Sequence, residues 1–407
     1  MNWFEVDDLA SPRPNPRIEP ILRAVLDAGG TPLRPGELLA EAVRQTGLTD
    51  FGGEEFRRPL EILCTALRTE AGLSPVGEVS LAAGLVQLLG NRLLVEDLFA
   101  RHPEIAAVPV DRPIVIAGLP RTGTTHLHRL LAAAPGVRTV PYWESAEPVL
   151  ATPVHPDPRP ERAHRALEFV DLALPHLKRM HELDAREAEE DIRLLAIAFS
   201  STYFECQVPV PAYRDWYLGT DQKPAYAFLR RVLQALTWLR GGGRWVLKAP
   251  QHLEQLPALC SVFPDATVVF THRDPATAVA SLSTMAAYSA RMIQRVVDVP
   301  AIASYWADRI EHLIGRFLAD HAAVPAECSV HVPFTEIVTD PLGVAERVLA
   351  AAGVPYTAEA KAALDDYVRG HPRDRHGRMR YDTDVLGLTG RRPSAALTAY
   401  RARFGEE

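Results

Sequence analysis

Two hydrophobic patterns alternate along the 407-residue chain, and together they predict an α/β protein. Short runs of apolar, often β-branched residues between turn residues are typical of buried parallel strands. They occur at 114–117, 137–140, 245–247, 266–271 and 328–332. Stretches with apolar residues three or four positions apart are typical of helices and separate these runs. The alternation favours a parallel sheet, similar to that of P-loop proteins, flanked by helices.

The first 110 residues show helical patterns and no convincing strand. Apolar residues recur at helical spacing over 18–28, 35–46, 54–71 and 79–101. We therefore predict an N-terminal helical subdomain over 1–110, an α/β domain over 111–395 and a C-terminal tail over 396–407. Within the α/β domain, a helical insertion on the substrate side is expected at about 150–243, with helices at 162–176, 185–199 and 224–240.

Two features of this insertion are open to more than one interpretation. The acidic run Glu187, Glu189, Glu190 and Asp191 suits a helix N-terminus and is expected to be solvated surface. The aromatic residues between 203 and 217 are as compatible with core packing as with an apolar acceptor pocket.

The segment 113–135, PIVIAGLPRTGTTHLHRLLAAAP, combines a strand, a turn bracketed by Gly118 and Gly123, and a helix start. Unpaired N–H groups and the helix dipole make such a helix N-terminus an anion site. The G-x4-G spacing is that of a Walker A loop, but Thr124 stands where that motif has lysine. The cation of the turn is Arg121, and Thr125 adds a hydroxyl. An anion other than a magnesium-bound nucleoside triphosphate is indicated.

Two later strand ends carry further cations. Lys248 follows the strand at 245–247, and Arg273 follows the strand at 266–271. Side chains at the carboxyl ends of parallel strands face the ligand crevice, so both are expected near Arg121. Asp274 and Pro275 are typical of an N-cap and a first helical residue, and the helix that they begin carries Ser281.

The stretch GLPRTGTTHLHRLL resembles the 5′-phosphosulfate loop of sulfotransferases that use 3′-phosphoadenosine 5′-phosphosulfate (PAPS), in the arginine-bearing form known from tyrosylprotein sulfotransferases and bacterial relatives. The order RDP…S resembles the pair that binds the 3′-phosphate in that family. The resemblance covers about residues 110–395. It implies nucleotide contacts from the following residues: Arg121, Thr122, Gly123, Thr124, Thr125, Arg273 and Ser281.

The same resemblance implies the catalytic residues. Lys248, in KAP, is similar to the lysine that contacts the leaving oxygen, and Arg121 is expected to stabilise the transferring group. Glu144 has the placement of the family's base, a little over twenty residues beyond the loop arginine. Near the C-terminus, Arg373, Arg375, Arg378 and Arg380 surround Gly377 and loosely resemble the family's nucleotide-binding loop. Arg378 is the expected phosphate contact, and Tyr381 is its expected neighbour.

Composition limits the partners. A net charge of -7 and a pI near 6.1 argue against a nucleic-acid partner. Four scattered cysteines are typical of reduced thiols in a cytoplasmic protein, and no signal peptide, membrane span or metal motif is recognised. The sequence does not indicate an oligomeric state.

We expect an enzyme that transfers the sulfuryl group of PAPS to a hydroxyl of a small molecule or lipid-like acceptor, without a metal. An apolar alcohol is favoured, and sugars and phenols stay open. Two rivals are a small-molecule kinase of the P-loop type and a non-catalytic phosphoadenosine-binding module.

Overall fold

A five-stranded parallel sheet forms the centre of the protein. The computed structural model describes residues 3–372 and 375–405. The strand order is β3-β4-β2-β5-β6. The strands are β3 (Val137–Arg138), β4 (Arg244–Lys248), β2 (Ile114–Gly118), β5 (Thr267–His272) and β6 (Ser329–Pro333). Each lies within two residues of the run that predicts it, and β2 is the middle strand.

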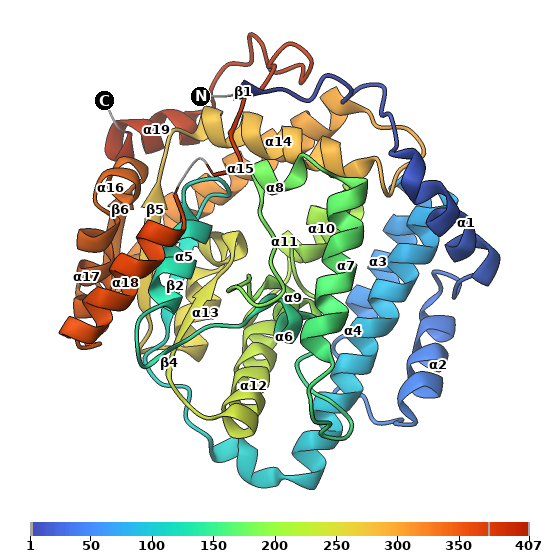
Figure 1. The fold of residues 1–407 in the computed structure, drawn as a ribbon, viewed down its shortest axis with the longest axis horizontal. Coiled ribbons are helices and arrows are strands. Elements are labelled where there is room, and N and C mark those ends of the chain that lie inside the picture. The colour runs from blue at the N-terminus through green and yellow to red at the C-terminus, as the bar shows by residue number, and fades with distance from the viewer. Residues whose placement is uncertain (1–2, 373–374, 406–407) are drawn as a thin grey trace.

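Helices cover both faces of this sheet, as the sequence predicts (Figure 1). Alternate residues of β2 face opposite sides: Ile114 and Ile116 join one hydrophobic cluster, and Val115 and Ala117 join the other. The first cluster is completed by α5 (Thr124–Ala132), α16 (Phe334–Thr339), α17 (Pro341–Ala351) and α18 (Ala358–Gly370). The second includes side chains of α12 (Lys223–Arg240), α13 (Leu256–Val262), α14 (Pro275–Ala290), α15 (Val299–Asp320) and α19 (Ala395–Phe404). This burial on both faces explains why the strands read as continuous apolar runs.

The N-terminal helices share the second of these clusters. They are α1 (Glu19–Ala28), α2 (Pro35–Thr46), α3 (Arg57–Thr69) and α4 (Pro75–Arg101). The segment also has a strand that the sequence analysis missed: β1 (Trp3–Phe4) pairs in parallel with β7 (Arg378–Met379). A two-residue strand is too short to show alternation, so no local pattern could reveal it. The pairing ties the chain start to the basic C-terminal segment.

Among the helices of the described residues, α4 alone is long and apolar enough to cross a membrane, by length and composition only. Over half of its most apolar window is buried inside the protein, at 56%. Asn91 and Arg92 are buried within it, and Arg92 Nε donates to the carbonyl of Phe51 at 2.7 Å. These contacts are those of a core helix.

The segment between β3 and β4 is helical, as predicted, but one predicted helix is wrong. It contains α6 (Tyr142–Ala146), α7 (Arg159–Ala173), α8 (Leu177–Met180), α9 (Ile192–Ala196), α10 (Tyr203–Gln207) and α11 (Pro211–Leu218). In place of a helix over 185–199, only α9 is helical between 181 and 199. The backbone of 185–189 instead bonds to 140–143, as in Glu189 N to the Val140 carbonyl at 2.8 Å. These long-range bonds override the local helix preference.

Candidate active site

The loop between β2 and α5 has the conformation of an anion cradle. Gly123 caps α5 in the left-handed region at φ 85°, and Arg121 takes a positive φ of 70°, which is unusual for a residue with a side chain. Gly118 has no room for a side chain, since a Cβ atom there would lie 1.9 Å from Thr271 Oγ1. Such local strain is typical of functional sites.

Thr122, an expected nucleotide contact, does not line the cavity in front of the loop. Its Oγ1 donates to the Leu119 carbonyl at 2.7 Å and lies 2.6 Å from Thr271 Oγ1. The hydroxyl is therefore fully buried and turned toward β5. Its role is to fasten the loop to the neighbouring strand. Thr124 and Thr125 line the cavity in front of the loop.

The second predicted anion site lies directly beside the first. Asp274 caps α14 by accepting from Thr277 N at 3.0 Å, so the predicted helix start is confirmed. Arg273, just before this cap, donates through Nη1 to the Arg121 carbonyl at 2.7 Å. Ser281 Oγ accepts from Arg121 Nε at 2.9 Å. The fold thus brings the two loops, about 150 residues apart in the sequence, within reach of one ligand.

The C-terminal basic segment closes over the same place. Arg378 and Tyr381 line the cavity, and Tyr381 Oη accepts from Ser281 Oγ at 2.8 Å. Arg375 pairs with Glu182, which also lines the cavity, at 2.5 Å. Arg373, the remaining arginine of interest before Gly377, lies outside the described residues.

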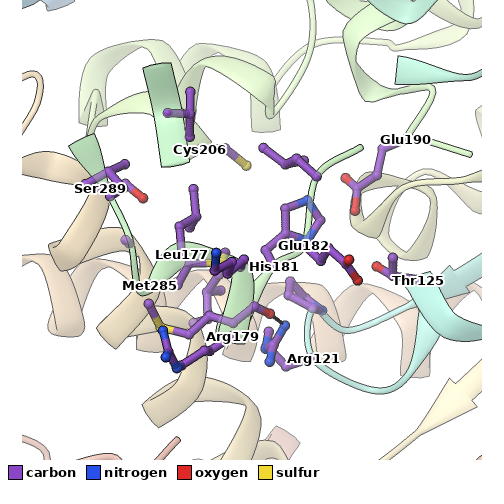
Figure 2. Close-up of a pocket in the computed structure, with 18 of the residues that line it drawn as sticks. Arg121, Thr125, Leu177, Arg179, His181, Glu182, Glu190, Cys206, Met285 and Ser289 are labelled. Carbon is purple, nitrogen blue, oxygen red and sulfur yellow. Dashed lines mark hydrogen bonds between the residues drawn. The ribbon is translucent and has the colours of Figure 1, made fainter. Parts of the chain in front are cut away.

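One large cavity joins these groups. Its volume is about 910 Å³. Arg121, Gly123, Thr124, Thr125, Arg273 and Arg378 line one part of it. Figure 2 shows Thr125 and Glu190 toward one side of the pocket, and Met285 and Ser289 toward the other. A cavity of this size, with polar groups concentrated in one part, is typical of a small-molecule site.

Lys248 lies just behind the cavity wall at the end of β4. Its side chain is 1% exposed, and Nζ lies 2.5 Å from Glu190 Oε1 and 3.3 Å from Thr125 Oγ1. Its backbone N–H donates to Asp191 Oδ1 at 2.8 Å. One ammonium therefore links the anion loop to a carboxylate that lines the cavity.

The acidic run is the main group that the sequence analysis misjudged. Glu189 and Asp191 are buried and Glu190 is largely covered, so the prediction of solvated surface is wrong. Asp191 Oδ2 lies 3.1 Å from Nε2 of the fully buried His252. Burial raises the pKa of Glu190 above its ordinary value, although the Lys248 ammonium opposes the rise. His181 also lines the cavity, and burial lowers its pKa to about 4.

Glu144, the base expected from the sequence, does not line this cavity. Its side chain is 2% exposed and pairs with Arg240 at 3.2 Å and Arg138 at 3.7 Å. These arginines stack on Trp143 and Trp245, each with 4.5 Å to the ring. Burial raises the pKa of Glu144, and both arginines counteract it. Glu144 therefore joins α6, β3 and α12 as part of the framework.

Comparison with known proteins agrees with this geometry. The family model described as "Sulfotransferase family" matches residues 113–358. Sulfotransferase STF1 from Mycobacterium tuberculosis H37Rv is 30% identical with a TM-score of 0.77, covering 91% of this chain and 97% of its own. Sulfotransferase STF9 from Mycobacterium avium is 27% identical with a TM-score of 0.81, covering 91% and 95%. A search of curated proteins gave no significant match. The match over more than half of the chain, together with these full-length likenesses, shows that this protein belongs to the sulfotransferase family and is an enzyme of sulfuryl transfer.

Proposed function

We propose that the protein transfers the sulfuryl group of PAPS to the hydroxyl of a small organic acceptor. The observation that carries the proposal is the meeting of the two anion sites in one cavity, with Arg273 bonded to the Arg121 carbonyl at 2.7 Å. A nucleotide with phosphate groups at both its 3′ and 5′ positions needs two such sites at opposite ends. Membership of a sulfotransferase family removes the kinase and the non-catalytic module as rivals.

The 5′-phosphosulfate is assigned to the loop before α5. Backbone N–H groups of Gly123, Thr124 and Thr125 precede or begin this nine-residue helix, where the dipole favours an anion. Its sulfonate would accept hydrogen bonds from Arg121 and from the threonine hydroxyls. The fit is supported by the closeness of the backbone at Gly118, which leaves no side chain between loop and strand.

The 3′-phosphate is assigned to Arg273, Ser281 and Arg378. In the described structure the Arg121 guanidinium bonds to Ser281 Oγ and to the Met180 carbonyl, so it points toward this second site. A phosphate bound there would compete for Ser281, and the Arg121 side chain could then swing to the sulfonate. Arg121 would serve both ends of the nucleotide in turn.

We assign Glu190 as the general base in place of Glu144. The acceptor oxygen attacks sulfur while the bond from sulfur to the 5′-phosphate oxygen breaks, and the acceptor proton passes to Glu190. The products are a sulfate ester and adenosine 3′,5′-bisphosphate. Lys248 lies behind Thr125 of the anion loop, and its positive charge stabilises the leaving oxygen from there. Positioning and electrostatics supply the catalysis.

Glu190 is preferred to His181 because of its contacts and its basicity. It touches Lys248, whereas His181 Nε2 lies 4.0 Å from Glu189 Oε1. A base works best with a pKa near the working pH, and burial moves the pKa of Glu190 toward that range. A histidine whose pKa is lowered to about 4 is a weak base.

A transfer assay with ³⁵S-labelled PAPS and a mixed panel of alcohols tests the function. We expect labelled sulfate esters to form without added metal, and Arg273→Ala to lower the rate by weakening donor binding. A panel with no labelled ester, together with no binding of adenosine 3′,5′-bisphosphate, would overturn the proposal. Magnesium-dependent phosphate transfer from ATP would instead support a kinase.

A further inference from the structure

We propose that the acceptor is an alcohol with a long, flexible apolar chain, which lies in the part of the cavity farthest from the anion loop. This inference rests on the proposed function, because the hydroxyl must reach the sulfuryl group. It adds the chemical class of the acceptor and the path of its chain.

Helix α14 gives the direction of that path. Ser281 contacts Arg121 at the anion end, and Met285 and Ser289 follow at intervals of four residues on the same face. At 1.5 Å per residue, Ser289 lies about 12 Å beyond Ser281 along the helix. Met285 and Ser289 both line the cavity, which therefore continues well past the nucleotide site (Figure 2).

The walls of this part are mainly apolar and come from six helices and the turn after α14. They include Leu22, Val25, Val76, Phe169, Val170, Ala173, Leu177, Leu282, Met285, Ala286, Met292, Ile293, Trp306 and Leu313. Two of the five methionines of the chain are among them, Met285 and Met292. Methionine is flexible and polarizable, so such a wall adapts to a chain with many conformations better than to a rigid ring.

The apolar face of α1 supports an apolar occupant. This helix has no fully buried side chain, although Leu22 and Val25 face the cavity. Ile21 and Leu26, on the same helix, are 42% and 41% exposed. A ligand chain lying along α1 would cover Leu22 and Val25 and gain free energy in proportion to the apolar area removed from water. Figure 1 shows α1 at the right-hand edge of the molecule, where it contacts α4.

One charged side chain of the cavity, Arg309, is already neutralised. Arg309 lies at the cavity but pairs with Glu254 at 2.9 Å and with Glu205 at 2.9 Å. All three side chains are at most 4% exposed. Arg179 also lines the cavity, and Figure 2 shows it beside Met285. A sugar acceptor needs polar partners along its whole length, whereas most of this wall is aliphatic. An alkyl chain needs no such partners.

A series of straight-chain primary alcohols, from butanol to hexadecanol, tests the proposal with labelled PAPS as donor. Each added methylene should raise kcat/KM by about fourfold, the equivalent of about 0.8 kcal/mol, until the chain fills the cavity. Ser289→Phe should end this rise at a shorter chain and leave butanol unaffected. Ser304→Phe, on an exposed position of α15, is the matched control and should change nothing.

Binding is measured separately, so that a failure of the chemistry can be told from a failure of the cavity. Dodecanol with a terminal bromine should quench the fluorescence of Trp306, which lines the cavity, and Trp306→Phe should remove that part of the quenching. Quenching without sulfation would reject the proposed function and keep the apolar site. The inference would be overturned if kcat/KM did not depend on chain length, or if sugars were preferred to alcohols. It would also be overturned if Ser289→Phe lowered kcat/KM equally for all alcohols.

Discussion

The substitution Glu190→Gln removes the proposed base while keeping the size of the side chain. Glu190 Oε1 lies 2.5 Å from Lys248 Nζ, in a site where the lysine is 1% and the glutamate 19% exposed. A general base contributes about 10²- to 10⁴-fold to a rate. We take the lower end, about 10²-fold in kcat, because the arginine and lysine contacts that stabilise the transferring group remain.

The pH dependence of kcat/KM gives a second, independent test of the proposed base. Burial raises the pKa of Glu190, so kcat/KM of the wild type should fall as the pH drops through a value above the ordinary 4.3 or so for glutamate. Lys248→Met removes the cation that opposes this rise, and the acid limb should then move to a still higher pH. The limb should be absent in Glu190→Gln.

The assay is steady-state sulfate transfer across a pH series, with affinity for adenosine 3′,5′-bisphosphate measured in parallel. Glu187→Gln is the matched control, because this carboxylate lies three residues earlier and does not line the cavity. Its kcat should match that of the wild type. The reasoning is refuted if Glu190→Gln keeps its turnover, or if the acid limb survives in it and disappears in His181→Asn.

Three further predictions concern the framework of the site. Glu144→Gln should keep kcat within about twofold but lower the free energy of unfolding by about 1–3 kcal/mol, because the substitution leaves Arg138 and Arg240 without their buried carboxylate partner. A large loss of kcat in folded protein would instead support Glu144 as the base. Gly118→Ala should abolish nucleotide binding in calorimetry, since its Cβ would lie 1.9 Å from the Thr271 hydroxyl of β5. The control Gly84→Ala has open space around the new Cβ and should bind the nucleotide normally. Equal nucleotide affinities of the two variants would contradict the close approach at Gly118. Burial lowers the pKa of His128 and His272 to about 3, so the unfolded chain binds more protons below pH 6.5 and stability falls as the pH drops. Each should cost about 2 kcal/mol between pH 6.5 and 5 in denaturant unfolding, and an unchanged midpoint would count against neutral buried histidines.

Local chemistry explains what the sequence predicted well. The turn from Gly118 to Gly123 and the Asp274 cap depend on residues within a few positions of each other, and both occur as expected. The apolar runs gave all five strands of the main sheet, because burial on both faces leaves little choice of residue type.

The proposed base could not be read from the sequence, because the choice between the two glutamates depends on contacts between distant segments. Glu190 contacts Lys248, 58 residues further along the chain, and Glu144 contacts Arg240, 96 residues away. Both are glutamates near cations, and the spacing from Arg121 favours Glu144 rather than the proposed base. One signal in the sequence was the cluster of four carboxylates at 187–191. Carboxylates are costly to bury unless each is paired, so a buried cluster needs cations from elsewhere in the chain.

The central claim is that the two anion sites bind opposite ends of one nucleotide, and calorimetry tests it directly. The wild type should bind adenosine 3′,5′-bisphosphate about tenfold to a hundredfold more tightly than AMP, the equivalent of one or two charge-assisted hydrogen bonds. Arg273→Ala should remove most of this difference and leave the affinity for AMP unchanged. Equal affinities in the wild type, or an equal loss for both nucleotides in Arg273→Ala, would contradict the account.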